Sequence, residues 1–189
     1  FPNVFNERAD LTPVFETFKA QVSTSENEAL LNLSLANTRA RLRMTTLYYF
    51  AGIHGLLVAG TGNKVEDFGV GFFTKYGDGG VDISPIADLV KSEVRLLAEF
   101  LEVPSSILKA KPTDGLFGDD RSDEDQIGAN YDELEWAMTQ MENGKTVADF
   151  SGREAVVFSI FKRLNFINQH KMNPIPVCEI SKKTKYLSN

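Results

Sequence analysis

A short polar segment follows a buried-strand pattern in the first third of the chain. The segment GTGNK at 60–64 comes directly after the apolar run LLVA at 56–59. Ligands of open α/β sheets bind outside the carboxyl ends of the strands, which places this segment where a nucleotide would lie. Its glycines permit close approach of the backbone, Thr61 offers a hydroxyl, and Glu66 offers hard oxygen ligands for Mg²⁺. A tight turn between a strand and a helix is the alternative interpretation.

A glycine-dense segment at 68–80 carries the next group of charged side chains. Lys75 and Asp78 lie within it, Asp82 follows it, and Lys91 lies in the first turns of the next predicted helix. Cations beside phosphates and carboxylates beside ribose hydroxyls are the usual division of labour in nucleotide sites. Solvated loop charges are the alternative interpretation of this segment.

His170 and Lys171, near the end of the chain, form a further candidate contact for an anion. Positive side chains that complement the dipole at a helix C-terminus are the alternative. A structural zinc site is disfavoured, because the chain has only two histidines and one cysteine.

The elements that position these residues follow from hydrophobic periodicity. Helical spacing predicts helices near 13–22, 26–33, 37–52, 131–141 and 156–167, and another that starts at Ser84-Pro85 and closes before Pro104. The run at 56–59 predicts a central parallel strand buried on both faces, and 81–83 predicts a second short strand. The acidic, glycine-rich stretch at 111–128 predicts a mobile loop. Strands with helices outside them indicate an α/β layered sheet.

Composition bounds the class of protein. The chain has 189 residues, of which 42% are hydrophobic, so a single domain spanning 1–189 is expected. A net charge of -6 gives no electrostatic footprint for nucleic acid. No apolar run approaches the roughly 18 residues of a membrane span. Because the single cysteine, Cys178, cannot form an internal disulfide, a soluble, cytoplasmic protein is expected.

Four motifs together resemble the NAD⁺ synthetase family. They are NTRARLRM at 37–44, GTGNKVE at 60–66, GFFTKYGDGGVD at 71–82 and KPT at 111–113. Their order and spacing also agree with that family, and the resemblance runs from about residue 10 to about residue 176. The stretch at 71–80 is long and specific, far beyond a lone glycine pattern.

This resemblance implies a Rossmann-like α/β fold of the ATP pyrophosphatase type, a homodimer and the chemistry of a ligase. ATP would adenylate the nicotinate carboxylate of deamido-NAD⁺, and ammonia would then displace AMP to give NAD⁺. ATP and Mg²⁺ are the implied cofactors. The reaction needs no side-chain nucleophile, and no catalytic residue is assigned, because positioning and electrostatics would carry the catalysis.

The resemblance also implies the residues of the site. ATP would contact Thr61, Lys91 and Thr113, and Glu66 would bind Mg²⁺. Deamido-NAD⁺ would contact Arg41, Lys75, Asp82, His170 and Lys171.

The chain departs from the family pattern at both ends. Family members begin with a strand and a Ser-Gly-Gly-x-Asp-Ser loop that cradles the ATP phosphates, and no such sequence occurs here. We expect this N-terminal part of the fold to lie before Phe1, and we expect these residues alone not to make NAD⁺. After His170 and Lys171, the sequence MNPIP at 172–176 replaces the further basic residue and paired prolines of the family.

Two alternatives stay open beside this function. One is a non-catalytic nucleotide-binding or dimerisation fragment that lacks the phosphate loop. The other is a different amidating ligase of the ATP pyrophosphatase type, such as one that aminates XMP. Free ammonia is the expected nitrogen source, because the chain contains no glutaminase signature.

Overall fold

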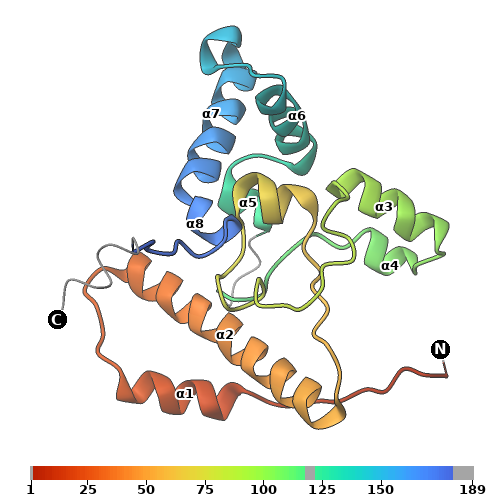
Figure 1. Ribbon diagram of the computed structural model, residues 1–189, viewed down its shortest axis with the longest axis vertical. Helices are drawn as coiled ribbons and strands as arrows, with labels where there is room; N and C mark the ends of the chain where they lie inside the picture. The colour runs from red at the N-terminus through yellow and green to blue at the C-terminus, as the bar shows by residue number, and fades with distance from the viewer. Residues whose placement is uncertain (1, 118–121, 181–189) are drawn as a thin grey trace.

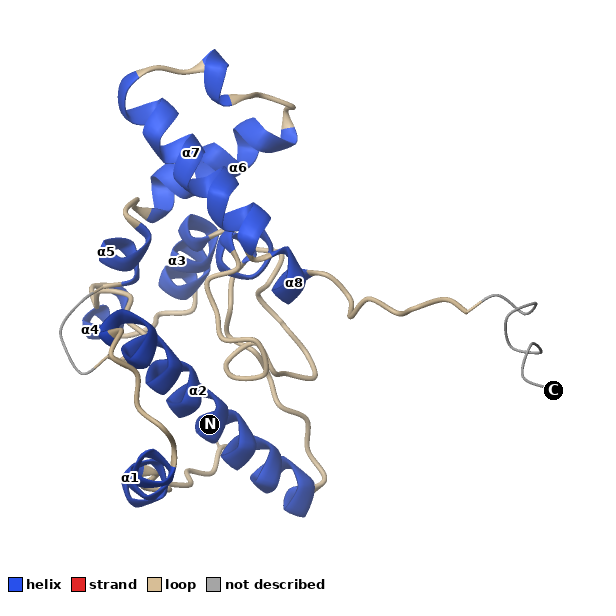
Figure 2. Ribbon diagram, turned by 90° about the vertical axis from the view of Figure 1, so that its left-hand side faces the viewer, coloured by secondary structure: helices blue, strands red, loops and turns tan. Residues whose placement is uncertain are grey.

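The computed structural model of the protein describes residues 2–117 and 122–180. Its elements are α1 (Thr12–Gln21), α2 (Glu28–His54), η1 (Val65–Val70), α3 (Lys91–Phe100), α4 (Ser105–Leu108), α5 (Asp123–Ile127), α6 (Tyr131–Glu142), η2 (Val147–Asp149), α7 (Gly152–Ile167) and α8 (Gln169–Met172). Figures 1 and 2 show α1 and α2 at one end of the molecule and α6 and α7 at the other, with the glycine-dense loop between them. The helices predicted near 13–22, 131–141 and 156–167 are confirmed as α1, α6 and α7.

The long helix α2 replaces the two helices predicted at 26–33 and 37–52. The side chain of Asn27 caps its first turn, and the helix continues unbroken to Gly55, whose φ of 64° is left-handed. The predicted break was wrong because residues 34–36 contain neither glycine nor proline, so nothing interrupts the helix. Within 2–117 and 122–180, no helix is both long and apolar enough to cross a membrane.

The two predicted strands meet in a single parallel bridge between Ala59 and Ile83. The parallel direction is as predicted, but the described residues form no extended sheet. The prediction that the first run is buried on both faces is wrong, because Leu56 and Leu57 are 65% and 67% exposed and only Val58 is buried beside the bridge. In the part of the chain that the structure describes, nothing covers the two leucines.

The core lies where η1 packs against α6 and α7. This six-residue π-helix buries Val65 and Val70 completely. The other buried members of the core are Ile127, Ala129, Leu134, Ala137, Val157, Phe158 and Phe161. The loop predicted at 68–80 therefore starts later than expected: residues 68–70 are helical, because burial of Val70 in the core overrides the weak helix propensity of the glycines.

Helix α3 begins at Lys91 and not at Ser84-Pro85, as was predicted. Residues 85–88 form turns instead. The start of α3 is tied to α6, because the carboxylate of Glu135 accepts from the amide of Ser92 at 2.9 Å and from its hydroxyl at 2.6 Å. This tie fixes the position of Lys91 relative to α6.

The acidic stretch at 111–128, predicted as a loop, contains α5. Ser122 caps this helix: its hydroxyl accepts from the amide of Asp125 at 3.1 Å, and its own amide donates to the Asp125 carboxylate at 3.0 Å. Residues 118–121 of the predicted loop lie outside the described residues.

Two arginines of α2 hold the segment that precedes these residues. Arg39 donates to the carbonyl of Leu116 at 2.7 Å, and Arg43 donates to the carbonyl of Asp114 at 3.1 Å. Leu116 is itself buried against α2. The position of segment 113–117 is therefore set by α2, far away in the sequence.

Gly71 offers a test of this packing. Its φ is 63°, and an added Cβ would lie 2.5 Å from the Cβ of Asn168. We expect Gly71→Ala to lower the free energy of unfolding by roughly 2–4 kcal/mol, the sum of left-handed strain and overpacking. Gly144→Ala is the matched control, because its φ is 73° but no atom lies within 4 Å of the added Cβ. Equal losses for the two variants in urea denaturation would contradict the packing at Gly71.

Candidate functional site

The start of η1 holds Glu66 in a defined position. Asn63 is buried, and its side-chain oxygen accepts from the amides of Val65 at 3.0 Å and Glu66 at 3.1 Å. A Cβ at position 62 would lie 2.2 Å from a carboxylate oxygen of Asp67, so any larger residue there requires the Asp67 side chain to move. The polar segment after the bridge is therefore a tight helix start whose shape depends on Gly62 and Asn63.

Three side chains from α3, α5 and α6 lie around Glu66 of η1, and we call the four residues the Glu66 cluster: Glu66, Lys91, Asp123 and Tyr131. Lys91 Nζ donates to Glu66 Oε1 at 3.1 Å, and the hydroxyl of Tyr131 donates to the same oxygen. The hydroxyl also lies 3.5 Å from Asp123 Oδ2. Lys91 Nζ lies 4.6 Å from the centre of the Tyr131 ring, within the range of a cation–π contact.

Burial and neighbouring negative charges raise the pKa values of three groups in this cluster and beside it. Burial raises the pKa of Asp123 to about 6, and the nearby carboxylates of Asp114 and Glu66 add to the rise. Burial likewise raises the pKa of Asp67 to about 6, with Glu66 contributing. The pKa of Tyr131 is also raised, first by burial and then by Glu66, so its hydroxyl keeps its proton and acts as a donor.

The two threonines predicted to contact ATP lie next to this cluster along the chain. The amide of Asp123, a member of the cluster, donates to the carbonyl of Pro112 at 3.0 Å. Thr113 is the next residue along the chain after Pro112. Thr61 is exposed and lies two residues before Asn63, whose amide is 3.4 Å from Glu66 Oε2. Of the residues predicted for ATP and metal, the structure thus brings Glu66 and Lys91 into direct contact.

Four residues predicted to contact deamido-NAD⁺ form a second group, which we call the basic cluster: Arg41, Lys75, His170 and Lys171. Arg41 donates to the carbonyl of Lys75 at 3.3 Å, and Lys75 Nζ donates to the carbonyl of His170. Lys171 Nζ donates to the carbonyls of Gly71 at 2.9 Å and Phe73 at 2.7 Å, and burial lowers its pKa. The cluster joins α2, the glycine-dense loop and α8.

Asp82, the fifth residue predicted for this substrate, lies beside the bridge. Its carboxylate accepts from the amide of Val58 at 2.8 Å and from the hydroxyl of Tyr48 at 3.0 Å. Tyr48 stands two helical turns after Arg41 on α2, and therefore on the same face of that helix. The structure connects Asp82 to the basic cluster through α2, without a direct contact between them.

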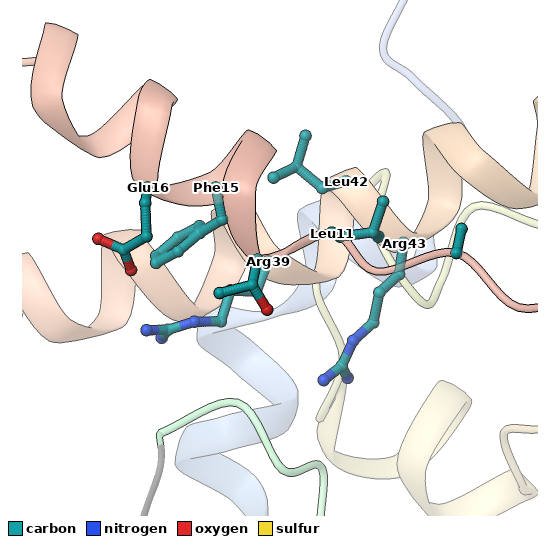
Figure 3. A pocket seen from close by; sticks show the side chains of 8 residues that line it. Leu11, Phe15, Glu16, Arg39, Leu42 and Arg43 are labelled. Atoms are coloured by element: carbon teal, nitrogen blue, oxygen red, sulfur yellow. The ribbon is translucent and has the colours of Figure 1, made fainter.

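A cavity of about 390 Å³ lies apart from both clusters, between α1 and α2. Its lining includes Leu11, Phe15, Arg39 and Arg43, which Figure 3 shows together. Arg39 stacks on the ring of Phe15 at 4.1 Å from its centre. Because both arginines already bind the backbone of segment 113–117, this cavity belongs to the anchoring of that segment.

Three residues of the site were missed from the sequence: Asn63, Asp123 and Tyr131. The role of Asn63 could have been predicted, because an asparagine three residues before a glutamate is typical of the start of a helix. Local sequence did not indicate Asp123 or Tyr131, because both are brought near Glu66 from more than fifty residues away: Tyr131 by a hydrogen bond and Asp123 by its electrostatic effect.

Carboxylates and a lysine gather after a parallel bridge and beside helices, which is where ligand sites of open α/β folds lie. A family model described as NAD synthase matches residues 3–174, and the chain belongs to this family.

Individual relatives agree with that assignment. The chain is 52% identical over 99 residues to an NH₃-dependent NAD⁺ synthetase from Methanococcoides burtonii, covering 52% of this chain and 37% of the relative. It is 36% identical over 181 residues to one from Methanocaldococcus jannaschii, covering 91% and 66%. The chain thus spans two-thirds or less of the length of these relatives.

A solved structure extends the comparison to the fold. NMN synthetase from Francisella tularensis superposes with a TM-score of 0.74 and 31% identity, covering 90% of this chain and 65% of that protein. The fold class is therefore the Rossmann-like α/β class predicted from the sequence, of which the described residues contain one parallel bridge and the surrounding helices.

Asp123→Asn tests the burial of this carboxylate. An acid whose pKa is raised on folding binds more protons in the folded state, so its contribution to stability falls as pH rises from about 4 to about 6. We expect the variant to gain roughly 1–3 kcal/mol of unfolding free energy relative to the unmodified protein between about pH 4 and pH 7. Urea denaturation at both pH values measures this gain.

Asp125→Asn is the matched control in the same helix. Hydrogen bonds from Ser122 lower the pKa of Asp125, so its contribution to stability is present at pH 7 and lost as pH falls through the folded pKa. This variant should therefore lose stability relative to the unmodified protein as pH rises. The same direction for both variants would contradict the raised pKa of Asp123.

Proposed function

We propose that this protein converts the nicotinate carboxylate of deamido-NAD⁺ into the amide of NAD⁺, at the expense of ATP and with ammonia as the nitrogen donor. Membership of the NAD synthase family supports the reaction class. The observation that carries the proposal is the contact between Glu66 and Lys91 at 3.1 Å, beside the backbone contact that positions Thr113. A carboxylate and a lysine so placed suit a metal-bound polyphosphate.

The chemistry proceeds in two displacements. A carboxylate oxygen attacks the α-phosphorus of ATP, which forms a mixed anhydride and breaks the bond to pyrophosphate. Ammonia then attacks the carbonyl carbon, AMP leaves with the bonding electrons, and the amide nitrogen loses its extra proton to solvent. Lys91 offsets the negative charge of the phosphates in the first step, and the protein contributes mainly positioning.

Mg²⁺ fits the donors of the Glu66 cluster. Glu66 and Asp123 offer hard carboxylate oxygens, and the buried Oδ1 of Asp123 has no hydrogen-bond partner among the described residues. Within the described ranges, no group of three or more ligating side chains is gathered. Mg²⁺ typically uses one or two carboxylates with phosphate and water, and it would neutralise phosphate charge here.

The basic cluster is proposed to bind the dinucleotide substrate. Arg41, Lys75 and Lys171 bring positive charge to one place, and Asp82 offers a carboxylate for ribose hydroxyls. As part of this proposal the protein is a homodimer and acts in the cytoplasm. The single cysteine supports a reducing location, because it leaves no internal disulfide.

A second candidate substrate is nicotinate mononucleotide. It is favoured by the structural likeness to a protein named NMN synthetase, at a TM-score of 0.74. Both substrates present the same carboxylate, so the Glu66 cluster serves either reaction. The two candidates differ in whether an adenylate half is held as well.

The assay is amidation by the full-length polypeptide that contains these residues, with ATP, Mg²⁺ and ammonium chloride, because residues 1–189 contain no Ser-Gly-Gly-x-Asp-Ser phosphate loop. Deamido-NAD⁺, nicotinate mononucleotide and XMP are supplied in parallel, and products are separated by chromatography. We expect NAD⁺ to form with the highest kcat/KM, together with substrate-dependent ATP–pyrophosphate exchange. Amide formation only from XMP, or no exchange with any substrate, would overturn the proposal in favour of another ligase or a non-catalytic protein.

Substitution of one lysine in each cluster tests whether the two clusters bind different substrates. Lys75→Met should raise KM for deamido-NAD⁺ by about tenfold with little change in KM for ATP, because a charged hydrogen bond is worth roughly 1.5–3 kcal/mol. Lys91→Met should instead raise KM for ATP and lower kcat. Lys162→Met, at an exposed position on α7, is the control and should match the unmodified enzyme. Identical kinetic effects of Lys75→Met and Lys91→Met would contradict two separate subsites.

A further inference from the structure

We propose that Tyr131 is a positioning residue of the nucleotide site, whose hydroxyl and ring together fix the carboxylate of Glu66 and the ammonium group of Lys91. The inference rests on the proposed function, because it assigns Glu66 and Lys91 to metal and ATP. Tyr131 lies 1% exposed and is therefore out of reach of any substrate. It acts through its neighbours.

The hydroxyl of Tyr131 contacts both carboxylates of the cluster. It donates to Glu66 Oε1 and lies 3.5 Å from Asp123 Oδ2. A neutral donor between two carboxylates reduces the repulsion that would otherwise drive them apart. The two acids therefore stay close enough to share one cation.

The Tyr131 ring contributes separately from the hydroxyl. Lys91 Nζ lies over the ring while it donates to Glu66 Oε1, so the ammonium group is held from two sides. Lys91 and the Tyr131 hydroxyl both bind Oε1 of Glu66, whereas the one hydrogen bond of Oε2 within residues 2–117 and 122–180 is a long contact of 3.4 Å with the amide of Asn63. The geometry thus leaves Oε2 as the oxygen least committed to the protein.

The support for Tyr131 is rigid. It is the first residue of α6, whose start is capped by Asn130. Its amide donates to the carboxylate of Glu124 at 3.0 Å, and its side chain is closed off from solvent between η1, α5 and α6. A hydroxyl with so little freedom can hold a carboxylate orientation that Glu66 by itself would lose among its rotamers.

Tyr131→Phe separates positioning from simple packing. The variant keeps the ring, its volume and its contact with Lys91, and removes only the hydroxyl. Tyr49→Phe is the matched control, because Tyr49 is 63% exposed on α2, away from the cluster. Circular dichroism and thermal melting check that both variants fold.

The measurement is binding of Mn²⁺ to the intact protein in the presence of α,β-methylene-ATP, followed by the electron paramagnetic resonance signal of free Mn²⁺. We expect Tyr131→Phe to weaken Mn²⁺ binding by about tenfold, the usual effect of removing a partner that orients a ligand. Tyr49→Phe should match the unmodified protein. In turnover, Tyr131→Phe should raise KM for ATP and leave KM for the second substrate unchanged.

A second measurement keeps the test decisive if Tyr131→Phe does not fold. Addition of Mn²⁺ with the ATP analogue to the unmodified protein, or to Tyr49→Phe, should perturb the ultraviolet absorption of a buried tyrosine. Unchanged Mn²⁺ affinity in folded Tyr131→Phe, or no tyrosine perturbation in the unmodified protein, would overturn the role of Tyr131 alone. If the unmodified protein binds no Mn²⁺, the proposed function falls and this inference falls with it.

Discussion

Burial of the π-helix η1 between α6 and α7 fixes both polar clusters at once. Its first turn carries Glu66, and its end is closed where the Glu66 carbonyl accepts from the amides of Gly71 and Phe72. Lys171 binds the carbonyl of that same Gly71. Because Val65 and Val70 have no exposed surface, η1 cannot shift without opening the core. Both ends of the candidate site therefore rest on one short element.

The charged residues of the site also stabilise the fold that surrounds it. Lys171 loses solvation on burial, but two backbone carbonyls of the glycine-dense loop accept from its ammonium group. Asp82 similarly holds the bridge through the amide of Val58. The glycine-dense loop is thus held by side chains from outside it as well as by its own hydrogen bonds, such as the one from the Thr74 amide to the Asp78 carboxylate at 2.9 Å. A substrate that binds Lys171 or Asp82 competes with these internal contacts, or shares them.

Hydrophobic periodicity and motif resemblance correctly predicted the parts of the molecule whose structure depends on local sequence. Apolar spacing predicted α6 to within one residue and the end of α7 correctly, although α7 begins four residues earlier than predicted, and the resemblance placed Glu66 and Lys91 in one site. Local pattern failed where distant packing decides the structure. Exposure of Leu56 and Leu57 depends on what lies beside the bridge, and the π-helical turn at 68–70 depends on the core. The role of Tyr131 depends on a fold that brings α6 against η1.

The two clusters share a continuous bonded path, and this has a consequence for the proposed reaction. From Lys171 the path runs through Gly71 to the carbonyl of Glu66, whose carboxylate faces Lys91. Adenylation requires the substrate carboxylate and the α-phosphorus of ATP to meet within a few tenths of an ångström of their reacting geometry. Two binding groups on independent loops would meet this requirement rarely. Groups bonded to opposite ends of one buried helix keep their separation, so in the proposed reaction each bound substrate would be placed correctly for the other.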